Sequence, residues 1–140
     1  MYNKSCMRHA FAITVYFFTI SFSIASTSFY QEALQSFESN EFELSIKYLE
    51  KNIVFNPKSS ESYILLGKSY SALENSDKAE KYFKIAYTLI PENIELNFLL
   101  GEVSYNLGHI EEYAEYLSNL EILCPGKCNE IDKLKQLSAE

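Results

Sequence analysis

The 140-residue chain contains no tryptophan, only four glycines and only three prolines. Glycine and proline supply many of the turns that separate short strands, so a chain this poor in them is not expected to form an all-β sandwich or barrel. Its apolar content of 47% and charged content of 22% exclude a largely disordered chain. The length predicts one domain. Together these absences favour a single, mostly helical domain.

Acidic residues are missing from the first 25 positions. Lys4, Arg8 and His9 give a basic start, and residues 10–25 carry no charge. Small residues close this apolar run at Ala25, which is the order of regions in a secretory signal peptide. We therefore expect residues 1–25 to be a signal peptide, and the chain to be exported to a periplasm or secreted. The alternative is an uncleaved membrane anchor, although this apolar run is shorter than the roughly 20 residues that a membrane span needs.

Basic residues are scarce in the rest of the chain. Removal of residues 1–25 takes away two basic side chains and no acid, which leaves 10 Lys+Arg against 19 Asp+Glu and a formal net charge of −9. Such a surface repels phosphate backbones, so nucleic acid is not an expected partner. A membrane is expected as a partner only if the N-terminal segment stays uncleaved.

The few prolines and glycines are regularly spaced. Pro57, Pro91 and Pro125 follow one another at a constant interval that defines a 34-residue period, and Gly67 and Gly101 have the same spacing. A fixed period of this size indicates a solenoid, in which one supersecondary unit is repeated and stacked.

The unit at residues 60–93 shows how each repeat would fold. Its apolar and small residues recur at spacings of three, four and seven, which places them on one face of each of two helices. Asn75 precedes the second helix as a candidate N-cap, with acidic Asp77 in the first turn. Pro91 ends the pair, because proline cannot continue a helix. The patterned residues are Tyr63, Leu66, Gly67 and Tyr70 in the first helix, and Ala79, Phe83 and Ala86 in the second.

This pattern resembles the tetratricopeptide repeat, whose signature has an aromatic residue, Leu-Gly, Tyr, Ala, Phe and Pro at these spacings. Tyr63 stands where the family usually has tryptophan. The resemblance implies an all-α solenoid of antiparallel helix pairs in a right-handed superhelix, with repeats at 26–59, 60–93 and 94–127 and a capping helix within 128–140. The implied helices are 28–39, 42–55, 60–73, 76–89, 94–107, 110–123 and 129–138.

The outer units depart from the signature. The first unit is weak in its first helix but keeps Phe42, Ser45, Leu49 and Pro57 in register. The third keeps Leu100, Gly101, Leu107, Gly108 and Pro125, whereas Asn97, Ser104, Tyr113 and Leu117 replace signature residues. We expect Tyr105 and Ala114, each one position further on, to compensate through a slight helix rotation. The capping helix has one apolar stripe, formed by Ile131, Leu134 and Leu137.

The sequence contains no convincing catalytic arrangement. His109, the lone histidine after residue 25, lies between two predicted helices and is expected to be an exposed turn residue. Residues 67–69 read GKS but lack the upstream glycine of a phosphate-binding loop. Glu80 and Lys84 are four residues apart and predict a surface pair. We therefore predict no enzyme, no cofactor and no metal.

The resemblance implies instead a non-enzymatic interaction module, an adaptor or assembly scaffold, that binds a peptide or protein segment in a concave groove lined by the first helix of each unit. Leu34, Leu65 and Leu99 fit packing between repeats equally well. The family's carboxylate clamp needs Lys, Arg and Asn, and only Lys68 and Asn106 are available, so this mode is not expected. An anchored or self-associating structural protein is the alternative. The predicted groove residues are Tyr30, Phe37, Glu61, Ile64, Lys68, Glu95, Phe98, Glu102, Tyr105 and Asn106.

Cys124 and Cys128 bracket the Pro-Gly-Lys sequence at the end of the third unit. Redox enzymes usually space such a pair by two residues on a thioredoxin-like scaffold, and a metal site would need further ligands. Oxidising compartments favour disulfides. We therefore expect a disulfide that fixes the angle of the capping helix, with free thiols and a thiol–disulfide enzyme as alternatives.

Overall fold

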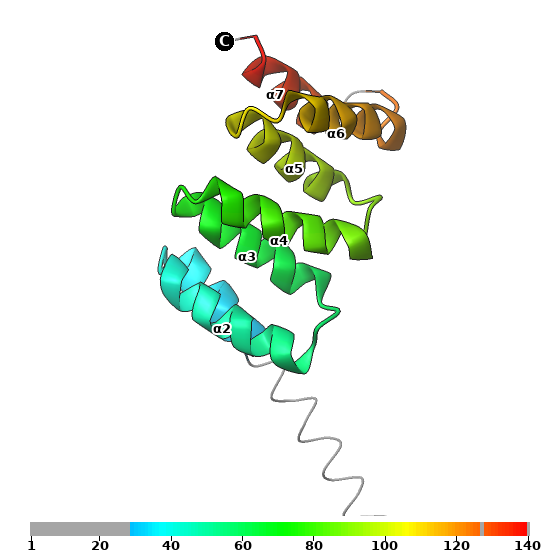
Figure 1. The fold of residues 1–140 in the computed structure, drawn as a ribbon. Coiled ribbons are helices and arrows are strands. Elements are labelled where there is room, and N and C mark those ends of the chain that lie inside the picture. The colour runs from blue at the N-terminus through cyan, green and yellow to red at the C-terminus, as the bar shows by residue number, and fades with distance from the viewer. Residues whose placement is uncertain (1–28, 127, 140) are drawn as a thin grey trace, which may run out of the picture.

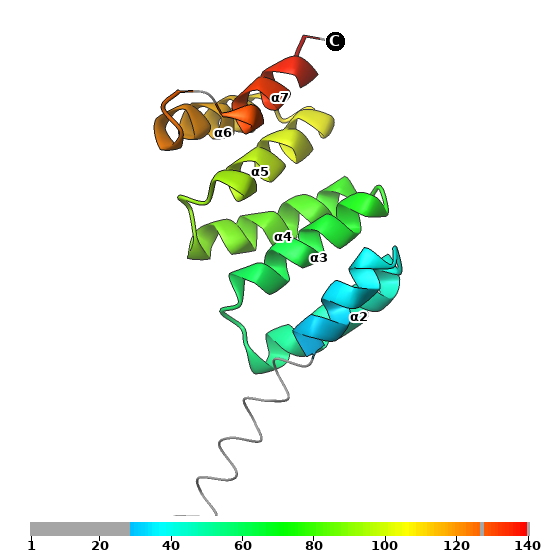
Figure 2. The ribbon, with the colours of Figure 1, turned by 180° about the vertical axis from the view of Figure 1, so that it is seen from behind.

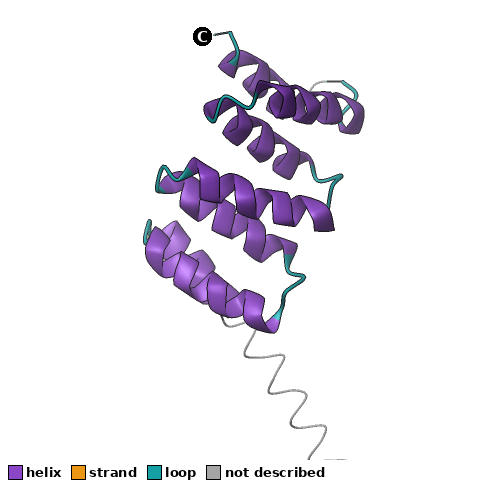
Figure 3. Ribbon diagram, in the orientation of Figure 1, coloured by secondary structure: helices purple, strands orange, loops and turns teal. Residues whose placement is uncertain are grey.

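The computed structural model describes residues 29–126 and 128–139, so the predicted signal peptide lies outside the described residues. The helices of this part begin and end within one residue of the predicted bounds. The described residues contain no strand (Figure 3), and none of their helices is long and apolar enough to cross a membrane. The helical segments are 29–38, α2 (Phe42–Phe55), α3 (Ser60–Ala72), α4 (Ser76–Leu89), α5 (Ile94–Asn106), α6 (Ile110–Leu123) and α7 (Asn129–Leu137).

The helices stack as antiparallel pairs along one axis (Figure 1). Residues 29–38 pair with α2, α3 with α4, and α5 with α6, while α7 lies against α5 and α6 at the C-terminal end. Figure 2 shows one face of the stack, formed by residues 29–38, α3, α5 and α7. We call it the first-helix face. The opposite face consists of α2, α4 and α6 (Figure 1).

The period of the sequence is also present in the backbone of the turns. Asn40, Glu74 and Gly108 occupy equivalent positions in the three repeats and have left-handed φ angles of 61°, 57° and 75°. In the next residue, the backbone N–H donates to the carbonyl five positions back, as from Asn75 to Tyr70 at 2.9 Å. The Asn75 side chain accepts a hydrogen bond from the N–H of Lys78, which confirms the predicted N-cap of α4.

Gly67 is required by close packing inside the second unit. A Cβ atom at this position would lie 2.3 Å from the ring of Phe83, which is 1% exposed and cannot move aside easily. In the third unit, the Cβ of residue 101 would instead lie 2.6 Å from Cδ2 of Leu134 in the capping helix. Each glycine therefore leaves space for one large side chain. In the second unit this is Phe83 of the same unit, and in the third it is Leu134 of α7.

We expect Gly67→Ala to destabilise the fold, because overpacking a buried aromatic ring costs about 1–3 kcal/mol and outweighs the helix-propensity gain of about 1 kcal/mol. Gly101→Ala should cost less, since it meets the end of a flexible leucine. In a Phe83→Ala background, Gly67→Ala should become neutral or stabilising. Urea denaturation of Gly67→Ala, Gly101→Ala, Phe83→Ala and the Gly67→Ala/Phe83→Ala double variant measures the energetic coupling between positions 67 and 83. Two results would contradict this account: an equal loss of stability in Gly67→Ala and Gly101→Ala, or additive losses in the double variant.

One predicted compensation in the third unit is wrong. Ala114 is exposed, whereas Tyr113 itself is buried at the signature position. No helix rotation is needed, because the Tyr113 ring packs beside Tyr105, with 5.4 Å between centroids, and its hydroxyl donates to the carbonyl of Leu134 at 2.9 Å. The capping helix thus makes room for the larger side chain.

Asn97 preserves an interaction that its aromatic counterpart makes. The Tyr63 hydroxyl donates to the carbonyl of Pro57 at 3.2 Å, six residues earlier. Asn97, which occupies the position of Tyr63 in the next repeat, donates through Nδ2 to the carbonyl of Pro91 at 2.8 Å. Both side chains therefore tie the start of a first helix to the proline turn before it.

Candidate partner-binding face

Three apolar side chains form a row across the first-helix face. Tyr30, Ile64 and Phe98 follow the period of the repeats, so each occupies the same position in its own repeat, and each is only partly buried. They come from residues 29–38, α3 and α5 (Figure 2). Because successive repeats stack in register, the three side chains offer a row of apolar contacts to a partner.

Acidic residues flank this row. Glu61 and Glu95 are exposed and occupy equivalent positions in α3 and α5. Lys68 forms an ion pair with Glu95, so its charge is already satisfied within the chain. Burial, and then the charges of Glu61 and Glu95, raise the pKa of the Tyr30 hydroxyl. Because Lys68 balances Glu95, the negative charge near the apolar row comes from Glu61.

Some predicted groove residues pack within the chain. The Phe37 ring contacts the Phe42 ring edge-on at 5.4 Å, and the Tyr105 ring contacts Tyr113. Leu65 is 5% exposed and belongs to the core, while Asn106 is exposed at the end of α5. The residues left to meet a partner are Tyr30, Glu61, Ile64, Glu95, Phe98 and Glu102, with Lys68 held by Glu95.

A pocket of about 260 Å³ lies at the C-terminal end of this face. The sequence predicted Phe98 and Glu102 there but missed its other wall, which α7 supplies. The pattern had given α7 only a capping role, because the helix lies outside the three repeats. The lining residues are Phe98, Glu102, Lys133, Gln136 and Leu137.

Residues 60–93 match the family model described as the tetratricopeptide repeat. The chain is a helical repeat protein with the tetratricopeptide-repeat fold. It has about three repeats and a C-terminal helix. A comparison of its sequence with curated proteins finds no match.

Several solved structures are similar to this chain, and they include tetratricopeptide-repeat domains. The second such domain of human RPAP3, in complex with the HSP70 peptide SGPTIEEVD, has a TM-score of 0.76 at 16% identity and covers 85% of this chain and 99% of that one. The Yersinia enterocolitica type III secretion chaperone SycD, in complex with a peptide of the translocator YopD, has a TM-score of 0.70 at 18% identity over 81% and 86%. The Arabidopsis OM64 domain has a TM-score of 0.73 at 16% identity over 83% and 96%. At these identities the likeness establishes the fold.

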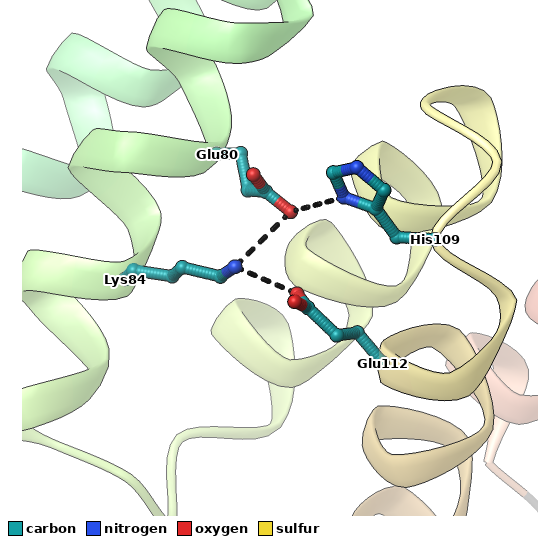
Figure 4. Close-up of polar contacts among 4 residues, drawn as sticks. All are labelled: Glu80, Lys84, His109 and Glu112. Atoms are coloured by element: carbon teal, nitrogen blue, oxygen red, sulfur yellow. Dashed lines mark hydrogen bonds and ion pairs between the residues drawn. The ribbon is translucent and has the colours of Figure 1, made fainter.

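A polar cluster joins the second and third repeats of the chain (Figure 4). Lys84 lies 3.3 Å from Glu80, the predicted surface pair, and 2.7 Å from Glu112 across the repeat junction. His109 precedes α6 as predicted, but its Nδ1 also lies 3.1 Å from Glu80. The hydrogen bond from Lys84 lowers the pKa of Glu112. These contacts hold α4 against the start of α6.

The same cluster contains potential metal ligands. Ligand atoms of Glu80, His109 and Glu112 all lie within 4.8 Å of one another. The Lys84 ammonium lies between the two carboxylates (Figure 4), so the chain supplies its own cation at this point. The arrangement is that of an ion-pair network between repeats.

The two C-terminal cysteines end α6 and precede α7, as the repeat pattern predicts. Both are free thiols here, and the disulfide between them stays a prediction. The Cys128 thiol donates instead to Glu130 at 3.2 Å. Its contact with Cys124, followed by burial, raises the pKa of Cys128 to about 11.

Proposed function

We propose that this chain is a non-enzymatic interaction module, an adaptor or assembly scaffold, that binds a peptide or protein segment along its first-helix face. The observation that carries the proposal is the aligned row of Tyr30, Ile64 and Phe98, partly exposed on three successive repeats. A row of equally spaced apolar anchors suits an extended or helical segment. The peptides held by the RPAP3 and SycD domains lend support from the same fold.

The charge of the face limits the choice of partner. Lys68 is paired with Glu95 and is not free to bind a C-terminal carboxylate. The peptide of the RPAP3 complex, SGPTIEEVD, contains three acidic residues. Glu61 and Glu102 would repel such a peptide, so we expect a neutral or basic segment here.

We further propose that the protein acts after export, in a periplasm or outside the cell. The basic start and the apolar run of residues 1–25 support this proposal. N-terminal sequencing of the protein from its own cells tests it. Export predicts a chain that begins after Ala25, whereas an intact N-terminus in the cytosolic fraction would contradict it.

Affinity capture from the native cell tests the binding proposal. Wild-type protein should retain a partner that Ile64→Ala and Phe98→Ala each lose by about tenfold, since a buried interface anchor contributes about 1.4 kcal/mol or more. Ile122→Ala, which removes a side chain that is 73% exposed on α6, serves as the control and should retain the partner. Circular dichroism must show that all variants are folded. Equal capture by all four proteins would contradict the proposed face.

A further inference from the structure

The pocket between α5 and α7 contains a carboxylate without a close partner. Among residues 29–126 and 128–139, the carboxylate of Glu102 has no hydrogen-bond or ion-pair partner. Its side chain is partly buried, and burial raises the pKa of its carboxyl group, while the nearby charge of Lys133 acts in the opposite direction. A desolvated carboxylate is stabilised by a cation that approaches it closely.

The walls of the pocket suit the rest of a long cationic side chain. Phe98 and Leu137 offer apolar surface, and Gln136 adds an amide. The Lys133 ammonium lies 5.8 Å from the centroid of the Phe98 ring, so this aromatic face already attracts a cation from within the chain. The volume of about 260 Å³ is below the roughly 300–1,000 Å³ of small-molecule sites and suits a single side chain.

We infer that this pocket binds a lysine or arginine side chain of the partner peptide. The aliphatic stem would lie along Phe98 and Leu137, with the charged group at Glu102. The inference rests on the proposed function, because the pocket continues the apolar row of the first-helix face. Charge complementarity favours a basic peptide over the other occupants, since Glu61 on the same face is also acidic, whereas Glu95 is balanced by Lys68.

Selection from a displayed library of random peptides tests the inference on the full chain. Wild-type protein should enrich peptides that share lysine or arginine at one position. Glu102→Gln, which keeps the shape of the side chain, should enrich peptides without that preference. Glu115→Gln changes an exposed acid on α6 and serves as the matched control, with the basic preference intact.

The affinity of one enriched peptide then tests the individual contacts. Norleucine in place of its basic residue, or Glu102→Gln in the protein, should weaken binding by at least about tenfold, as expected for the loss of a hydrogen bond to a charged group. Lys133→Met should strengthen binding by about two- to fivefold, because it removes the internal cation that competes for Phe98.

The outcomes separate this inference from the proposed function. Enriched peptides that compete with one another but show no basic position would overturn the inference and leave the proposed function standing. Failure to enrich any peptide would overturn both. Dimerisation of the wild-type chain that Glu102→Gln abolishes in sedimentation would assign the pocket to a second copy, and would also overturn the inference.

Discussion

Replacement of Phe83 by alanine is expected to lower the free energy of unfolding by about 3–5 kcal/mol. Phe83 is 1% exposed and fills the space over Gly67, at the centre of the core shared by α3 and α4. The free energy released by burying its ring is lost, and a cavity remains because Gly67 has no side chain to fill it. Since domains of this kind are stable by only about 5–15 kcal/mol, urea denaturation should show a large fall in the midpoint.

The control for this variant is Ile122→Ala. Ile122 is 73% exposed, so its loss should change the free energy of unfolding by no more than about 0.5 kcal/mol. A Phe83→Ala variant as stable as Ile122→Ala would mean that α3 and α4 do not pack as described.

Leu134→Ala is expected to release the capping helix. Leu134 is fully buried and lies over Gly101, so its truncation should cost about 2–5 kcal/mol. Because α7 packs mainly against α5 and α6, at the end of the stack, we expect it to open before the rest of the solenoid unfolds. Amide hydrogen exchange should accelerate in α7, while exchange in α3 and α4 stays slow.

Release of α7 should also remove one wall of the Glu102 pocket. Binding of a basic peptide by Leu134→Ala should therefore weaken together with the loss of exchange protection in α7. Asp132→Asn alters an exposed residue of the same helix that does not line the pocket, and should keep α7 protected. Slow exchange in α7 of the Leu134→Ala variant would show that Leu134 does not hold the cap.

The fold could be predicted closely from the sequence because its information is periodic and local. The proline spacing gave the length of the unit, and the N-cap at Asn75 and the small residue at Gly67 followed from that pattern. The packing inside the third unit could not be predicted from this pattern. Gly101 packs against the side chain of Leu134, and Tyr113 donates to the carbonyl of the same residue. Leu134 belongs to α7, which lies outside the repeats, so the rotation expected at Ala114 was wrong.

The site was predicted less completely. Residues of the first-helix face could be listed by position, but local spacing does not show which of them turn toward one another, as Tyr105 does toward Tyr113. The pocket wall at Lys133 and the link from Lys84 to Glu112 both join elements far apart in the chain. Such contacts depend on how the repeats and the cap stack, and no motif in the sequence marks them.

The central claim is that a partner segment lies along the first-helix face. Site-specific photocrosslinking in the native cell tests this claim most directly, with a benzophenone side chain placed at position 64 in one variant and at position 122 in another. The account predicts a crosslinked partner from position 64, on the first-helix face, and none from position 122 on α6. A partner captured from position 122 but not from position 64 would contradict it.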